Sequence, residues 1–446
     1  MTLLMLLPLL IAAVGGYFLW RLRAFFLFHP LRTLRTLRSA FTGEGNSFRT
    51  LMLALAGTLG VGNITGVAVG LLLGGAGSVF WLLFSALFAT VLKYAESTLT
   101  AGGEHRDGMI GVIRRRLPGG RFFSTVYALL CLGLTFFLGA GLQCRAVAGA
   151  AATLCRIPVS VSAVCFAVFL AVCFLGGVEK IAEKTAVLIP ITTALYMFLC
   201  IFTIFSGISA LPSVLRAIFS SAFTPPAAVG GCFGFLLSDA VREGFCRGLL
   251  SNEAGAGTST LAHAGNRATA PAAEGTLGIC EVFFDTVLLC MLTAFSLLLG
   301  AGDPSLYSDG FSYLYAAFSA LPAAVFSPIL LFCFFSFAAS TSLCWYYYGE
   351  IALNTLRKKK KRRTFYPFFF LLSAGVGGVL SELFLVRACD ILLFFAGILS
   401  LSALLYGADA VRAETLSAGL MTARGERRGE RDRRGRARAR RRSSLR

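Results

Sequence analysis

Residues 56–66 read AGTLGVGNITG, within a segment that is otherwise apolar. A second stretch of this kind, residues 248–257, reads GLLSNEAGAG. Both place glycine and polar residues where a helix in hydrocarbon should have neither, because unpaired peptide groups are costly there unless they line a protein-walled cavity. Interrupted helices in two halves of a membrane protein indicate a transport site near the membrane midplane. We therefore predict two broken helices that face each other.

The composition indicates a membrane protein. Of 446 residues, 57% are hydrophobic and 14% are charged, whereas soluble proteins carry about 25% charged residues. The thirteen cysteines include no C-x-x-C pair and mostly lie in apolar segments. We expect them to be buried thiols rather than disulfides or metal ligands.

The apolar segments predict an all-α, polytopic protein of the cell (plasma) membrane with about eleven transmembrane helices. The predicted spans are residues 2–20, 49–73, 76–101, 122–150, 158–176, 184–207, 230–264, 276–300, 322–356, 366–386 and 389–406. Residues 2–20 could instead be a signal peptide, but no basic residue precedes them and Arg21 and Arg23 follow at once. A retained first span is therefore favoured.

Arginine and lysine, which outnumber acidic residues by 19, gather in alternate connections. The rich ones are residues 21–48, 102–121, the short connection with Lys180 and Lys184, 357–363 and the tail from Arg412. Residues 207–229 hold only Arg216, and 301–321 hold no basic residue. With eleven spans, every connection rich in lysine and arginine falls on the same side of the membrane. The positive-inside rule identifies that side as the cytoplasm. This predicts an extracellular N-terminus and a cytoplasmic C-terminus.

The C-terminal tail, residues 407–446, becomes rich in arginine and almost free of large apolar residues from about residue 413. Such a segment cannot bury enough surface to fold by itself. We predict a disordered cytoplasmic tail that contacts anionic lipid. No aromatic or fold signature of nucleic-acid binding accompanies it, so no nucleic-acid partner is expected.

At the first predicted break, Gly57, Gly60 and Gly62 lower the cost of leaving helical geometry. Freed amides and the positive end of a half-helix suit a carboxylate, and freed carbonyls suit a cation. Asn63 adds a neutral side-chain oxygen. The alternative is a packing stripe, because glycine recurs every four residues at 62, 66, 70 and 74. That stripe explains the later glycines but not Asn63, Gly57 or Gly60.

At the second predicted break, which follows Arg247, Ser251, Asn252 and Glu253 should face the protein interior because polar groups are costly in lipid. Glu253 could carry a proton or could be the structural partner of the broken backbone, and we favour the structural role.

Three further polar groups stand out in apolar spans. The hydroxyls of residues 340–342 could complete a cation shell or bond to their own helical turn. Trp345 and the three tyrosines after it could form an interfacial belt or a pocket wall. Gln143 could make an interhelical hydrogen bond or line the site.

These residues resemble motifs of the alanine or glycine:cation symporter family, within the amino acid–polyamine–organocation superfamily. The resembling stretches are residues 60–68 (family GTGNIAGVA), 93–96 (KYAE), 177–190 (G-I-x-x-I-A…P), 247–255 (RGLFSNEAG), 284–286 (F-x-D-T-like) and 345–350 (GWYYYGE). The departures are Val61, Thr65, Leu250 and Thr260, and a basic stretch at 108–120 where the family has GGPMYYI.

The resemblance implies a ten-helix core of two five-helix inverted repeats, each with a broken first helix, at residues 49–207 and 230–406. An N-terminal helix and basic loop (1–48) would precede the core, and an extracellular connection (208–229) would join the repeats. It also implies a substrate site formed by Gly60, Gly62, Asn63, Gln143, Leu250, Ser251, Asn252 and Trp345. The implied sodium ligands are Ala56, Leu59, Asn63, Ser340 and Thr341.

We therefore expect sodium-coupled symport of alanine or glycine by alternating access, with no cofactor beyond the coupling ion. The alternatives are a proton-coupled or broader-specificity carrier, in which Glu253 or Asp285 titrates, and a non-transporting amino-acid sensor. An enzyme is not expected, because His29, His105 and His263 have no neighbouring nucleophile or metal-ligand pattern. The sequence predicts nothing about oligomeric state.

Overall fold

A computed structural model describes residues 2–42, 47–101, 107–174, 179–224, 238–263, 270–356 and 365–421, and all regular elements in these ranges are helical. The first half contains α1 (Thr2–Arg21), α2 (Phe25–Phe28), α3 (Pro30–Thr42), α4 (Ser47–Thr58), η1 (Gly62–Gly66), α5 (Val67–Gly74), α6 (Ser78–Ala101), α7 (Gly108–Arg116), α8 (Gly120–Leu134), η2 (Thr135–Leu142), α9 (Gln143–Cys155), α10 (Val159–Phe174) and α11 (Glu179–Ser206). The second half contains η3 (Ile208–Ala210), α12 (Leu211–Ala222), α14 (Asp239–Asn252), α15 (Thr260–His263), α16 (Pro271–Val282), η4 (Phe283–Cys290), α17 (Met291–Gly300), η5 (Pro304–Leu306), α18 (Gly310–Phe318), α19 (Ala323–Leu356), α20 (Tyr366–Val379) and α21 (Glu382–Ser417).

The helices have the lengths and apolarity of a multi-pass membrane protein, as predicted. Among the described residues, six helices are long and apolar enough to cross a membrane, and the bent pair Ser47–Thr58 and Gly62–Gly74 makes a seventh. Shorter apolar helices include α1, α10 and α20. With the interrupted α14–α15 segment, these account for the eleven predicted spans.

The helices of residues 47–206 and 239–417 follow the same order of types. Each set begins with a broken helix, α4–η1–α5 or α14–α15. A long helix follows, then a helical segment of 36 or 34 residues, then a short helix of 16 or 14 residues, and finally a long one. This order agrees with two five-helix repeats, whose boundaries at 49–207 and 230–406 remain a prediction.

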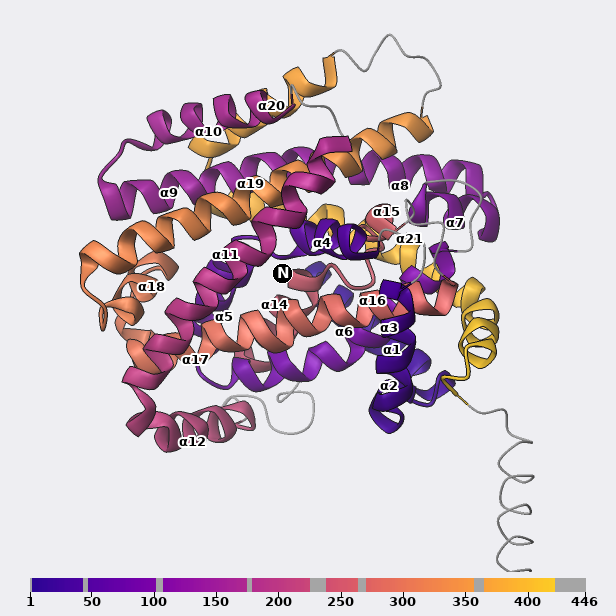
Figure 1. Ribbon diagram of the computed structural model, residues 1–446, viewed down its shortest axis with the longest axis horizontal. Helices are drawn as coiled ribbons and strands as arrows, with labels where there is room; N and C mark the ends of the chain where they lie inside the picture. The colour runs from indigo at the N-terminus through magenta and orange to yellow at the C-terminus, as the bar shows by residue number, and fades with distance from the viewer. Residues whose placement is uncertain are drawn as a thin grey trace, which may run out of the picture.

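The spans form two groups with α4 between them (Figure 1). Helix α6 packs most extensively against α14 and α16, and these lie on one side of the molecule. On the other side, α19 packs against α8 and α9, and α10 packs against α20. Helix α4 contacts both groups, through α16 and α19.

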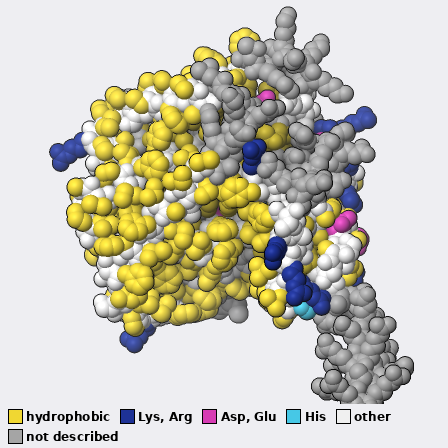
Figure 2. All heavy atoms as spheres, in the orientation of Figure 1, with side chains coloured by type: hydrophobic (Ala, Val, Ile, Leu, Met, Phe, Trp, Pro, Cys, Tyr) yellow, Lys and Arg dark blue, Asp and Glu magenta, His cyan; other side chains and the backbone are white. Residues whose placement is uncertain are grey.

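The outer surface suits a lipid environment. Figure 2 shows apolar side chains over most of one face, with lysine and arginine at its edges. Along α10, Val164, Val168 and Val172 recur at four-residue spacing and are 58–61% exposed. A soluble protein would bury such a stripe, whereas acyl chains cover it here.

Several predicted connections contain short helices. These are α3, α7, α12 and α18, each too short to span and each packed by one face against the spans. Helix α21 continues past the predicted end at 406 to Ser417, because Val411 is buried and the Thr415 hydroxyl bonds to the Tyr94 hydroxyl (2.9 Å). The basic run 357–363, Arg106 and tail residues 422–446 lie outside the described residues.

Close contact between α6 and α14 depends on glycine. A Cβ added at Gly244 would collide with the Ser78 carbonyl oxygen, and one added at Gly248 would lie 2.8 Å from the Leu82 carbonyl oxygen. These glycines let the two backbones approach, as small residues do at membrane helix interfaces.

We predict that Gly244→Ala destabilises the protein by about 1–3 kcal/mol, because overpacking must push α14 away from α6. The measurement is the thermal unfolding midpoint of purified protein in detergent. Gly375→Ala in α20 is the matched control, since nothing lies within 4 Å of its added Cβ and alanine is the better helix former. Equal midpoints for the two variants would contradict the packing argument.

Candidate functional site

The first glycine-rich stretch leaves helical geometry after Thr58 and resumes it at Gly62, with a bend of 52°. Gly57 is still helical, and its added Cβ would lie 3.0 Å from the hydroxyl of Tyr348. Gly57 therefore serves close packing against α19. Of the three predicted break glycines, Gly60 lies between α4 and η1, and Gly62 is the first residue of η1.

The break releases two backbone carbonyls. In an α-helix, the carbonyls of residues 56 and 59 would accept from the amides of residues 60 and 63. Here the Gly60 amide donates to Thr58 (2.9 Å), and the Asn63 amide donates to Gly60 (3.2 Å). The carbonyls of Ala56 and Leu59, both predicted sodium ligands, thus lose their helical donors.

The second stretch leaves helical geometry after Asn252, not after Arg247 as predicted. Helix α14 continues through this region because Gly248 is a packing position against α6, where a side chain would meet Leu82. Leu250, Ser251 and Asn252 consequently form the last turn of α14. The carbonyls of a last turn have no partner further along the helix.

The turn that follows is held by side chains. Glu253, Gly255 and Gly257 have left-handed φ angles of 53°, 84° and 72°. This conformation costs a non-glycine residue about 1–2 kcal/mol, and at Glu253 a hydrogen bond from the Thr258 hydroxyl to its carboxylate offsets the cost. This arrangement agrees with a structural role for Glu253.

Residues of α6 and α8 face the same turn. The buried carboxylate of Glu96 lies beside the amides of Gly255 and Gly257, although neither contact reaches hydrogen-bond geometry. The Tyr127 hydroxyl donates to the carbonyl of Ala256 (2.5 Å). The exposed peptide groups of the turn therefore meet polar protein groups rather than lipid.

Asp285 of η4 connects the two broken helices. Its buried carboxylate accepts hydrogen bonds from the Asn63 amide, the Ser251 hydroxyl (2.9 Å) and the Thr286 hydroxyl (3.1 Å). The amide of Asn252 donates to Thr286 as well. Asp285 lies in the resembling stretch 284–286 and belongs to the proton-coupled alternative, and a carboxylate in an apolar span is a signal of function by itself.

A group of buried polar atoms without partners lies at the first break. The added Cβ of Gly60 would be 3.0 Å from Thr341 Oγ1 and 3.6 Å from Gln143 Oε1. Both oxygens are buried and have no hydrogen-bond partner in the described structure, as is also true of Trp345 Nε1 one turn beyond Thr341. Each such atom costs about 1–3 kcal/mol. The convergence of the Thr341 and Gln143 oxygens at Gly60 indicates a place that a polar ligand or water fills.

The remaining predicted residues have different surroundings. The Ser340 hydroxyl donates to the carbonyls of Ser336 (2.9 Å) and Phe337 (3.0 Å) in its own helix, and its lone pairs stay available to a cation. Gly62 is exposed, with nothing within 4 Å of an added Cβ. The side chain of Leu250 lies outside the described residues.

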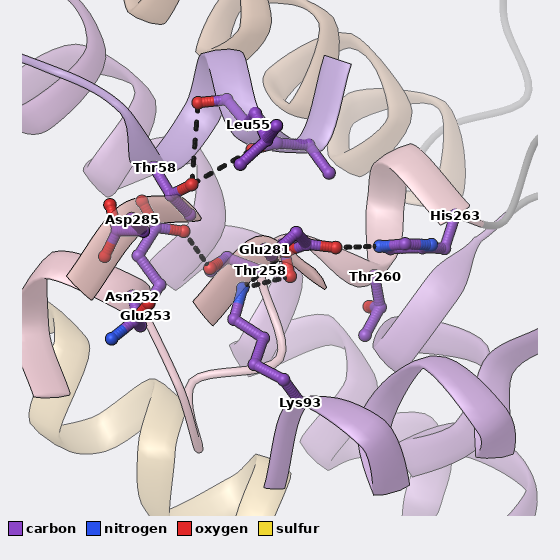
Figure 3. Close-up of polar contacts among 12 residues, drawn as sticks. Leu55, Thr58, Lys93, Asn252, Glu253, Thr258, Thr260, His263, Glu281 and Asp285 are labelled. Carbon is purple, nitrogen blue, oxygen red and sulfur yellow. Dashed lines mark hydrogen bonds and ion pairs between the residues drawn. The ribbon is translucent and has the colours of Figure 1, made fainter. Parts of the chain in front are cut away.

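A buried ionic network lies beyond the second turn (Figure 3). Lys93 Nζ is 3.1 Å from Glu281 and 2.6 Å from the Ser259 hydroxyl. The ring of His263 bonds to Glu281 through Nε2 and to Glu274 through Nδ1 (2.7 Å). The network ties α15 to α6 and α16. This network was not predicted from the sequence, because Lys93 and Glu281 lie 188 residues apart, although charged residues in apolar spans are a usable signal.

The comparisons with known proteins bear on this geometry. Residues 1–417 match the sodium:alanine symporter family. The chain belongs to this family. The relatives that resemble this chain are transporters, so the protein is a cation-coupled amino-acid transporter and not an enzyme.

The relatives cover most of the chain. An uncharacterized transporter of Haemophilus influenzae is 33% identical over 317 residues, 69% of both chains. The sodium/alanine symporter AgcS of Methanococcus maripaludis is 32% identical over 321 residues, 69% of this chain and 70% of its own. The probable sodium/glutamine symporter GlnT of Bacillus subtilis is 29% identical over 368 residues, 79% of this chain and 75% of its own.

Solved structures agree on the fold. A crystal structure of the Eremococcus coleocola manganese transporter has a TM-score of 0.53 and 15% identity, and it covers 79% of this chain and 76% of that one. At this identity the likeness concerns the fold alone.

We predict that Lys93→Met destabilises the protein by about 3–5 kcal/mol, because it leaves the carboxylate of Glu281 buried without its lysine partner. The thermal unfolding midpoint in detergent measures this loss. Asp239→Asn is the matched control, because it removes an exposed ion pair between Asp239 (side chain 63% exposed) and Arg242 (27% exposed). This substitution should cost at most about 1 kcal/mol of stability. A Lys93→Met protein as stable as this control would contradict the structural importance of the network.

Proposed function

We propose that this protein carries a small neutral amino acid, alanine or glycine, into the cell together with sodium. The observation that carries the proposal is the convergence of released backbone carbonyls with the unpaired oxygens of Gln143 and Thr341 at Gly60. The family and the name of the Methanococcus relative support both the substrate and the ion.

The polarity of the site suits a zwitterion. Gln143 Oε1 and Asn252 Oδ1 are buried acceptors without partners, and Trp345 Nε1 is a buried donor without one. The acceptors, with the carbonyls that end α14, would bind an ammonium group. Trp345 and the amides at the breaks would bind a carboxylate. Because Gly60 itself has Thr341 within 3.0 Å of its Cβ position, the space favours a small side chain.

The proposed sodium ligands are the carbonyls of Ala56 and Leu59 with the hydroxyls of Ser340 and Thr341. Asn63 is a further candidate, although its Oδ1 accepts from the Gly60 amide in this structure. Neutral oxygens of this kind suit a hard cation. The membrane potential then contributes about 2.3 kcal/mol per charge per 100 mV to uptake.

Sidedness belongs to the same proposal. From the basic connections we propose that the N-terminus is extracellular and the C-terminus cytoplasmic. Exposure of the site to each side in turn would come from movement of the α6–α14–α16 group against the α8–α9–α19 group.

We expect Asn252→Ala and Thr341→Ala each to abolish sodium-dependent alanine uptake into proteoliposomes, because each removes an oxygen of the proposed site. Thr341→Ser should keep uptake, since it retains the hydroxyl. Thr90→Ala is a matched control, because that hydroxyl only bonds to Ala86 of its own helix. Normal uptake by both alanine variants, at normal amounts of folded protein, would overturn the site.

A second candidate is proton coupling, which the buried carboxylate of Asp285 between the two breaks favours. Under sodium coupling, replacing sodium by choline at fixed pH stops uptake. Asp285→Asn should then raise the half-saturating sodium concentration about tenfold or more, because it removes a negative charge near the ion. Uptake in choline that follows a proton gradient, and that Asp285→Asn abolishes, would establish the second candidate instead.

A further inference from the structure

A short helix outside the transport site, α3, has an unusual surface. Its sequence repeats Leu-Arg-Thr, and Arg32, Arg35 and Arg38 are all exposed. Large apolar side chains are exposed beside them, namely Leu31 (69%), Leu34 (57%) and Phe41 (42%). We call these six residues the α3 surface.

The α3 surface is one face of an amphipathic helix. Thr33 and Ala40 are buried on the opposite face, where α3 packs against α16. At 100° per residue, Leu31, Leu34 and Phe41 fall within one sector, and the arginines lie within and beside it. A helix with arginine beside exposed leucine and phenylalanine is typical of one that lies in the membrane interface.

The position of α3 also fits the interface. Arg21 at the end of α1 pairs with Asp409 of α21, and Arg32 donates to the Gly419 carbonyl just beyond α21 (3.3 Å). Helix α3 therefore lies where two long apolar helices end. Figure 2 shows lysine and arginine side chains gathered at this corner of the molecule, where Figure 1 places α1 to α3.

The positive charge of this corner favours an anionic partner. Residues 2–42 contain five arginines and no aspartate or glutamate. The side chains of Arg35 and Arg38 make no hydrogen bond or ion pair with any described residue, so their guanidinium groups are available. A second copy of the chain docked by the same surface would bring like charges together. A phosphodiester headgroup brings the opposite charge, and its acyl chains cover the leucines and phenylalanine.

We propose that the α3 surface is a binding site for anionic phospholipid in the leaflet at this end of the protein. Arg35 and Arg38 bind the phosphate, and Leu31, Leu34 and Phe41 contact the upper acyl chains. Because α3 packs against α16 through its opposite face, the lipid site is connected to the helix that carries Glu281 only through α3. The proposal is independent of the transported substrate.

The test uses the full-length protein in phosphatidylcholine vesicles that contain equal mole fractions of brominated phosphatidylglycerol or brominated phosphatidylcholine. Bromine quenches nearby tryptophan, and Trp20 is 75% exposed at the end of α1 beside this corner. Its signal is the difference between wild type and Trp20→Phe. We expect brominated phosphatidylglycerol to quench Trp20 about twofold more than brominated phosphatidylcholine, and high salt to remove the difference.

Arginine variants test whether the α3 surface causes the preference for brominated phosphatidylglycerol. The triple substitution Arg32→Gln, Arg35→Gln, Arg38→Gln should equalise the two quenchers. The control, Arg114→Gln, Arg115→Gln, Arg116→Gln, removes the same charge from α7, whose other residues, 108–113, are buried, and should keep the preference. The proposal would be overturned by equal quenching from the two lipids in wild type, by equal loss of the preference in both triple variants, or by cross-linking of two copies through α3. The wild-type and salt measurements decide the proposal even if a variant does not fold.

Discussion

Peptide groups released inside hydrocarbon must find polar partners, and this constraint determines most of the interior of the protein. At the second break, Thr258 bonds to Glu253, Tyr127 bonds to the turn, and Glu96 lies against its amides. At the first break the compensation is incomplete. The carbonyls of Ala56 and Leu59 lack their helical donors, and the nearby oxygens of Gln143 and Thr341 lack partners. The first break, where released carbonyls meet oxygens without partners, is where a ligand gains most by binding.

Charged residues connect the helices of one group to each other. Lys93, His263 and Glu281 join α6, α15 and α16 through buried ionic bonds, which are strongly destabilising to break singly. The contacts between α4 and α19 are of another kind: Gly57 lies close to Tyr348, and the Cys344 thiol faces the Leu53 carbonyl (3.1 Å). Contacts of this kind between α4 and α19 are compatible with the proposed movement of one group against the other.

The sequence was informative where a residue type had one physical explanation and misleading where it had two. An asparagine or aspartate in an apolar span must be paired, and Asn63 and Asp285 are paired with each other. A glycine can mark either a break or a close contact, so the predicted breaks began too early at Gly57 and Gly248, which are packing positions. The stripe interpretation holds at Gly70 and Gly74, which contact α14, but not at Gly66, which has open space. Partners such as Lys93 and Glu281, 188 residues apart, become apparent only once the helices are placed.

The charge balance of the proposed site also follows from this arrangement. A zwitterionic amino acid adds no net charge, whereas sodium adds one positive charge to a region of low dielectric, where an isolated ion is costly. The proposed sodium ligands are neutral, so they provide coordination but no compensating charge. Asp285 is bonded to Asn63 at one break and to Ser251 at the other, and is therefore the anion best placed to compensate for sodium without displacing its ligands. If this is its role, ion and substrate are coupled through the electrostatics of a residue that holds both broken helices, and neither needs to touch the other.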